Sequence, residues 1–229
     1  MLVPLFLLIF TAAPAPKTWT FKTSANPRIL VSNISGSISV EATTGDQVLV
    51  EAKVVGAEIS PWTVEASSSG DEVSVRACCG ACGEHTSNCG SNHDRVEITV
   101  KAPEKSVLRL KSVAASINVR GIKGSESIKS VSGPIEVAGT GNELELHSVS
   151  GDIKLTAAAI ENTKIHTVSG DVQIKLPKSP DVKVRLKSVS GRLNKASRLL
   201  GTTERVLGKG SKEIDIHTVS GSVDTDPTI

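Results

Sequence analysis

Four cysteines and two histidines are concentrated in one short segment, where they could form disulfides or bind a metal ion. The segment spans residues 78–93 and holds Cys78, Cys79, Cys82, Cys89, His85 and His93. In an oxidising compartment, two disulfides would stabilise a loop that has no core of its own. Four cysteines allow three connectivities, and a bond between the adjacent Cys78 and Cys79 is the most strained choice.

The same segment also suits a tetrahedral metal site. Cys79-x-x-Cys82 supplies two thiolates, and Cys78 or Cys89 with one of the two histidines would complete four ligands for zinc or copper. Reduced, reactive thiols are the third interpretation. Disulfides are favoured because the chain is expected to be exported. No cofactor is therefore expected, and a zinc or copper ion at this loop is the alternative.

A pair of carboxylates could act as a catalytic acid and base. Asp152 and Asp171 each follow a Ser-Gly pair in neighbouring copies of a repeated motif. On stacked strands they would lie about 5 Å apart, which is the separation found in retaining glycosidases. However, Pro134, Arg192 and Ser222 occupy the equivalent position elsewhere, so a preference of Asp for turns explains the pair. We expect no catalytic residues, with a β-helix enzyme acting on an anionic polysaccharide as the alternative.

Basic side chains recur at one position of the repeat and would form a surface ladder on stacked strands. The position is occupied by Lys111, Lys129, His147, His166, Lys187 and His217. Such a ladder could hold an anionic polymer, for example an acidic polysaccharide, or it could be ordinary solvated surface. The net charge of only +2 creates no strong field around the whole chain.

The repeat itself is the strongest structural signal in the chain. Its recurring element is Val-Ser-Gly, preceded by Ser or Thr and followed by alternating apolar residues. The glycines are Gly133, Gly151, Gly170, Gly191 and Gly221, with Ala115 in a degenerate copy, and the steps between them are 18, 18, 19, 21 and 30 residues. Alternation of period two predicts short strands, and such a unit buries its apolar face only by stacking on others. The sequence therefore predicts an all-β, single-stranded-type parallel β-solenoid (β-helix) with coils of about 18–20 residues. A β-sandwich is the alternative.

The solenoid makes specific packing predictions. The glycines should form one corner, through a positive φ or a close approach of two backbones, and the Ser or Thr hydroxyls should satisfy backbone groups there. The valine before each Ser-Gly should be buried in a column, with the next apolar residues behind it. The valines are Val131, Val149, Val168, Val189 and Val219, and the residues behind them are Ile135, Ile153, Val172, Leu193 and Val223.

Aromatic residues make up only 2% of the chain, and there is no Tyr. A site that stacks nucleic-acid bases or encloses a haem or flavin is therefore unexpected. Small branched side chains stack on themselves, which explains the deficit. Trp19, Phe21 and Trp62 lie outside the regular repeats, and we expect them to cover the N-terminal end of the stack.

The N-terminus indicates export. Residues 2–10 form an apolar run that is too short to cross a bilayer but suits a signal peptide. We expect residues 1–15 to be a signal peptide and residues 16–229 to form one periplasmic or extracellular domain without a membrane span. Within that domain, residues 78–93 form the Cys/His-rich loop, and residues 194–212 are an insertion, either a hairpin or a lateral loop, in a late coil.

The recurring Thr/Ser-Val-Ser-Gly-Asp-Ile/Val motif resembles that of the bacterial "putative adhesin" β-solenoid family. The resemblance covers most of residues 28–226 and extends to the Leu-Gly-Lys-Gly segment before the last Val-Ser-Gly. It implies a non-catalytic, exported module of the cell envelope with an adhesin-like binding or structural role. The expected partner is an envelope polysaccharide or protein and not a nucleic acid. Alternatives are the polysaccharide-active enzyme and a metal-handling protein that uses the Cys/His-rich loop.

Overall fold

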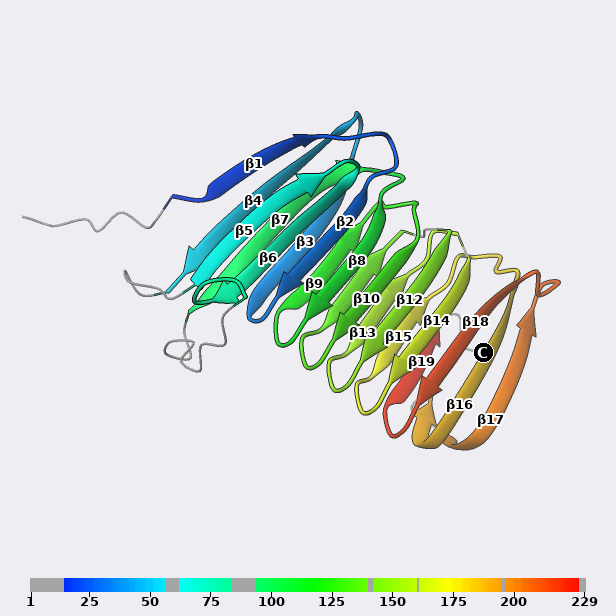
Figure 1. The fold of residues 1–229 in the computed structure, drawn as a ribbon. Helices are drawn as coiled ribbons and strands as arrows, with labels where there is room; N and C mark the ends of the chain where they lie inside the picture. Colours follow the sequence, from blue (N-terminus) through cyan, green and yellow to red (C-terminus); the bar gives the residue numbers. More distant parts are fainter. Residues whose placement is uncertain are drawn as a thin grey trace, which may run out of the picture.

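The computed structural model describes residues 15–56, 62–83, 94–139, 142–159, 161–194 and 197–226, and these residues form nineteen strands and no helix. The strands wind as stacked coils into one elongated body (Figure 1). Within this part of the chain, no helix is long and apolar enough to cross a membrane.

Each central coil consists of two short strands joined at a tight corner. The coils are β8 (Val107–Ser112) with β9 (Ser116–Arg120), β10 (Glu126–Ser130) with β11 (Ile135–Ala138), β12 (Glu143–Ser148) with β13 (Ile153–Thr156), and β14 (Asn162–Thr167) with β15 (Val172–Lys175). The first strands of successive coils pair in parallel, as do the second strands. Because the register matches motif to motif, equivalent residues of neighbouring coils lie side by side.

Antiparallel strands cover the N-terminal end of the stack. The coil of β2 (Arg28–Asn33) and β3 (Gly36–Thr43) lies between β8 and β9 on one side and β6 (Glu72–Cys79) and β7 (Arg95–Pro103) on the other. Outside these, β4 (Gln47–Val55) pairs antiparallel with β7, β1 (Lys17–Lys22) with β4, and β5 (Trp62–Ser69) with β6. As expected from sequence, Trp62 is buried there, and Trp19 and Phe21 pack partly against the core.

The C-terminal coil does not lie at the end of the stack. β18 (Lys212–Thr218) and β19 (Ser222–Asp226) pair with β14 and β15 on one side and with β16 (Val182–Leu193) on the other. β16 and β17 (Ser197–Leu207) form an antiparallel hairpin that closes this end. This hairpin begins in β16, before the insertion expected at residues 194–212. It lies outside the last coil, so the spatial order of the coils differs from their order along the chain.

These pairings confirm an all-β fold with parallel stacking of the central coils, which is compatible with a parallel solenoid. The sheet as a whole is mixed, because both ends contain antiparallel strands. The β-sandwich alternative does not account for the parallel pairing of the central coils.

Two columns of branched side chains run along the core. One is made of residues from the first strands, such as Leu110, Ile128, Leu146, Ile165 and Ile216, and the other includes Ile117, Ile135, Ile153, Val172 and Val223; all are buried. The predicted second column is confirmed, except that Leu193 is only partly buried. Burying each such side chain is worth about 1.5–3 kcal/mol, so the repeated motif contributes in every coil.

The repeated glycine exists because two backbones approach closely, and not because of an unusual φ. None of the five motif glycines has a positive φ. A Cβ built on Gly151 would collide with the carbonyl oxygen of Gly133 in the coil below, and one on Gly170 with that of Gly151. Ala115 is buried at the same corner without a positive φ.

The prediction that the motif valines are buried is wrong. Val131, Val149, Val168, Val189 and Val219 are 44–61% exposed. The inward position next to each valine is taken by Ser or Thr, because the corner needs a hydroxyl. Ser130 Oγ donates to the carbonyl of Gly133 at 2.7 Å, and Ser148 Oγ to that of Gly151 at 2.6 Å. A buried valine in place of that hydroxyl would leave the carbonyl unsatisfied.

Candidate binding face

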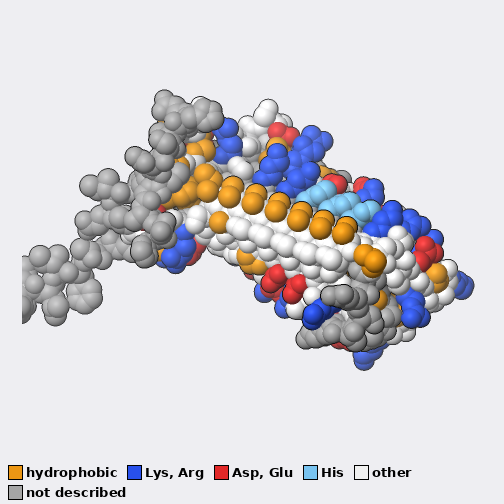
Figure 2. All heavy atoms as spheres, turned by 90° about the horizontal axis from the view of Figure 1, so that it is seen from below, with side chains coloured by type: hydrophobic (Ala, Val, Ile, Leu, Met, Phe, Trp, Pro, Cys, Tyr) orange, Lys and Arg blue, Asp and Glu red, His pale blue; other side chains and the backbone are white. Residues whose placement is uncertain are grey.

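The exposed valines form a continuous apolar line along the outside of the stack, which we call the valine row. In spatial order it consists of Val113, Val131, Val149, Val168, Val219 and Val189. Figure 2 shows hydrophobic side chains in a line beside the histidines. The next serine of each motif holds the line in place: Ser132 Oγ donates to the Val113 carbonyl at 3.1 Å, and Ser150 Oγ to that of Val131 at 3.2 Å.

Beside the valine row lies the basic ladder predicted from sequence. The strand register places its members next to one another in the order Lys111, Lys129, His147, His166, His217 and Lys187. Because each ladder residue is two positions before a motif valine, every coil in this region presents one basic and one apolar side chain.

Three histidines lie in contact at the centre of the ladder: the rings of His147 and His166 are stacked, and that of His217 is tilted against His166. The ring centroids of His147 and His166 are 4.9 Å apart, as are those of His166 and His217. His147 Nε2 lies 2.9 Å from a Glu145 carboxylate oxygen, and His217 Nε2 lies 3.2 Å from Asp215. Burial lowers the pKa of His166, and the neighbouring His147 and His217 lower it further. The hydrogen bond from His147 lowers the pKa of Glu145.

An open groove of about 770 Å³ runs over this part of the surface. Its sides are the basic ladder, the valine row and the middle of β17. The residues that line it include Lys129, His147, His166, His217, Lys187, Val149, Val168, Val219, Val189, Gly201 and Thr202. The groove therefore combines cationic or titratable groups with an apolar strip.

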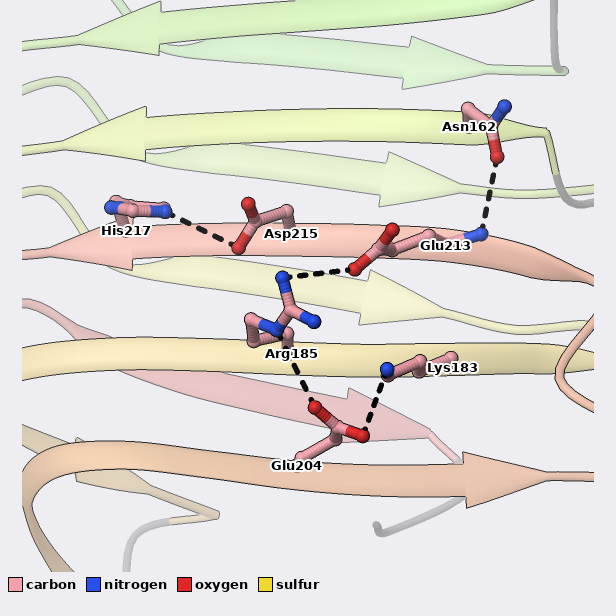
Figure 3. A network of polar contacts seen from close by, with 7 residues as sticks. All are labelled: Asn162, Lys183, Arg185, Glu204, Glu213, Asp215 and His217. Carbon is pink, nitrogen blue, oxygen red and sulfur yellow. Dashed lines mark hydrogen bonds and ion pairs between the residues drawn. The ribbon is translucent and has the colours of Figure 1, made fainter.

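Ion pairs hold β17 in place as one wall of the groove. Glu204 on β17 lies 3.0 Å from Lys183 Nζ and 3.4 Å from Arg185 Nε (Figure 3). Arg185 also reaches Glu213 on β18 at 3.3 Å. The hydrogen bond from Lys183, followed by that from Arg185, lowers the pKa of Glu204. The outer hairpin is thereby tied to the last coil.

The two carboxylates considered as an acid/base pair, Asp152 and Asp171, accept hydrogen bonds from backbone amides. Asp152 Oδ1 accepts the amide N–H of Asp171 at 2.9 Å, and Asp171 Oδ1 accepts that of Ser222 at 2.8 Å. Each Asp thus bridges to the next coil in space, as its position in a turn suggests.

The Cys/His-rich loop contains disulfides. Cys78 and Cys82 are bonded, with Cα atoms 5.2 Å apart, and Cys79 is also disulfide-bonded. A cysteine in a disulfide has no thiolate for a metal ion. Cys89, His85 and His93 lie outside the described residues. In the part of the chain that the structure describes, no three His, Cys, Asp or Glu side chains are grouped as metal ligands.

One buried carboxyl group was not anticipated. Glu126 is 3% exposed and lies between Leu108 and Leu144 in an inward column of the first strands. Its Oε2 has no hydrogen-bond partner, and burial raises its pKa to about 8. Alignment of the repeats would have shown a charged residue at an apolar position.

The family model described as Toastrack DUF4097 matches residues 28–225. No protein of curated function matches the chain.

Similar solved structures include a "putative cell adhesion protein" from Clostridium sporogenes, with 12% identity, a TM-score of 0.48 and coverage of 92% of this chain and 99% of the other. A "putative lipid binding protein" from Parabacteroides distasonis has 15% identity and a TM-score of 0.37, with coverage of 92% and 96%. A "putative adhesin" from Bacteroides fragilis has 9% identity and a TM-score of 0.31, with coverage of 92% and 97%.

Proposed function

We propose that this chain, which belongs to the Toastrack DUF4097 family, is a non-catalytic, exported binding module of the cell envelope. Its ligand is an anionic linear polymer, such as an acidic polysaccharide, that lies along the basic ladder and the valine row. In this proposal the central coils act as a rigid β-solenoid that repeats one binding unit at a constant spacing.

The observation that carries the proposal is the regular pairing of one basic and one apolar side chain in successive coils. Neighbouring strands repeat at about 4.8 Å, and the histidine rings follow at 4.9 Å. A polymer with a similar repeat can place one carboxylate near each basic group. The open groove suits a chain that enters and leaves at both ends, whereas a small ligand is usually enclosed.

The apolar line adds a reason to expect a partner. Soluble proteins rarely leave large contiguous apolar patches exposed without a binding function. Uronic-acid rings have an apolar face and an acidic edge, which matches a valine row beside a basic ladder. Lys129 and Lys187 lie towards the two ends of the groove, with the three histidines between them.

Export is supported by the disulfide between Cys78 and Cys82. Disulfides persist in the periplasm and outside the cell and are rare in the cytosol. An adhesin-like role in the envelope is consistent with this location.

The polysaccharide-active enzyme is less well supported, because Asp152 and Asp171 are engaged with backbone amides. Metal handling by the 78–93 loop is also less well supported, because three of its cysteines are in disulfides.

Calorimetric titration with polygalacturonate, and with neutral dextran as the reference, tests the proposal. We expect binding of the anionic polymer only, weakened by added salt and by the double substitution Lys129→Gln/Lys187→Gln. Lys154→Gln/Lys175→Gln is the matched control, because it removes two lysines from β13 and β15, outside the groove. Equal loss in both variants, binding of dextran, or release of new reducing ends from the polymer would each contradict the proposal.

A further inference from the structure

The outermost strand at the C-terminal end, β17, has an edge that can pair with another strand. It pairs with β16 along one side, and its other side faces outward from the stack (Figure 1). An edge strand presents unpaired backbone N–H and C=O groups, and these are a template for strand addition.

β17 also carries two strongly exposed apolar side chains. Leu200 is 82% exposed, the highest value for a large hydrophobic residue in the described part of the chain, and Val206 is 55% exposed. Each lies three positions from Thr203, on opposite sides of it along the strand. The strand is therefore nearly self-complementary about Thr203.

A twofold axis through Thr203 would pair β17 antiparallel with itself. Leu200 would then lie opposite the partner's Val206, and Val206 opposite the partner's Leu200. In the same register Glu204 faces the partner's Thr202, and Arg205 faces the partner's Gly201. No two like charges oppose each other. A shift of the register in one direction would place Glu204 opposite the partner's Glu204, which brings two like charges together. A shift in the other direction would place Leu200 opposite the partner's Glu204, which sets an apolar side chain against a charge.

We propose that the chain forms a twofold-symmetric dimer through antiparallel pairing of β17 with β17 of a second copy. Such an interface uses the same surface on both copies, so the assembly closes at two. A twofold axis perpendicular to the sheet keeps the outward faces of both copies on one side. Since Lys187 of the basic ladder pairs with Thr202 on β17, both binding faces then meet at the dimer centre.

The dimer is expected to be weak. One pair of strands buries less surface than the roughly 1,200 Å² of a stable interface. We therefore expect a dissociation constant of about 1–100 μM. The apolar contact supplies specificity of register, because Leu200 gains most of its burial from the partner. The proposal does not depend on the polymer-binding function, since it concerns the free protein.

Sedimentation equilibrium of the full chain over a concentration series tests the dimer. Leu200→Asp should raise the dissociation constant at least about tenfold, which is about 1.4 kcal/mol. Leu200→Asp combined with Val206→Lys should restore dimerisation, because each introduced carboxylate lies opposite an introduced ammonium of the partner. Leu200→Asp combined with Val206→Asp should not. Val113→Asp, at an exposed apolar site far from β17, is the control for added charge.

Circular dichroism of each variant shows that the fold is kept, as expected for such exposed positions. A chain that stays monomeric up to about 0.5 mM, above the expected dissociation constant, overturns the proposal. A dimer that is insensitive to Leu200→Asp, or that the oppositely charged pair does not restore, overturns it as well.

Discussion

The imidazole ring of His166 contacts that of His217 in a tilted arrangement, with ring centroids 4.9 Å apart, although Lys187 lies between the two residues in the sequence. The contact arises because the last coil is inserted between β14 and β16. It brings three imidazoles together at the centre of the groove, with a lysine towards each end. Burial and the two neighbouring imidazoles lower the pKa of the central one, His166.

The affinity for an anionic polymer should rise as the pH falls. Because the pKa of His166 is lowered by burial and by its two neighbours, its imidazole is neutral at pH 7.5 and gains charge only below its usual range. A bound polyanion favours the charged form. Titrations with the polymer between pH 7.5 and 5 should show a dissociation constant that falls progressively with the pH. The substitution His166→Asn should make this pH dependence smaller. An equal pH dependence of the affinity in the variant would contradict this role of His166.

Replacing Glu126 by Leu should stabilise the fold, because an inward apolar position now holds a carboxyl group without a partner for Oε2. The folded state keeps a proton that the unfolded chain releases, since the pKa is raised from 4.5 to about 8. The free energy of unfolding should therefore fall as the pH rises through this window, by up to about 1.4 kcal/mol per pH unit.

Urea unfolding of the wild-type chain and of Glu126→Gln, measured from pH 4.5 to 8, tests this sign. The substitution should remove the slope, whereas the control Glu143→Gln, at an exposed position of β12, should preserve it. Two results would show that other groups dominate. One is a free energy of unfolding that increases with pH in the wild-type chain, and the other is a decrease with pH that persists in Glu126→Gln.

Gly151→Ala should destabilise the stack by about 1–3 kcal/mol, because the added Cβ meets the carbonyl oxygen of Gly133. Ser150→Ala in the adjacent position removes only an exposed hydrogen bond to Val131 and should cost well under 1 kcal/mol. Thermal unfolding compares the two. If Gly151→Ala is no worse than Ser150→Ala, the close approach of the coils is not what demands glycine.

Asp152→Asn should be nearly neutral, because its side-chain carbonyl still accepts the amide of Asp171. Asp152→Ala should cost about 0.5–1.5 kcal/mol through loss of that bond. Unfolding curves separate the two variants. Equal destabilisation by both would mean that the negative charge, and not the hydrogen bond, matters at this corner.

Alkylation followed by mass spectrometry should find Cys78, Cys79 and Cys82 unmodified until a reductant is added. If these cysteines were thiolate ligands of a metal ion instead, a chelator alone would make them available for alkylation. Labelling of these three cysteines in the unreduced, chelator-free protein would contradict the disulfides and weaken the assignment to an oxidising compartment.

The repeat pattern was sufficient to predict the short strands of the central coils and their parallel stacking. It failed at Val131 and its equivalents, because alternation alone does not show whether Ser130 or Val131 points inward. The deciding factor is the corner carbonyl of Gly133, which needs the Ser130 hydroxyl. The spatial order of His217 and Lys187 was also beyond reach, since identical motifs do not specify which coil stacks on which.

The position of the last coil also constrains how the protein folds. Synthesis starts at the N-terminus, so β16 and β17 are made before β18 and β19. In the folded protein, however, the β16–β17 hairpin lies outside the coil of β18 and β19. The hairpin cannot dock directly on β14 and β15 without occupying the space of a later segment. We therefore expect completion of this end to wait until residues 212–226 are available, so that closure of the stack is a late folding step in which β18 and β19 insert between β14/β15 and the hairpin.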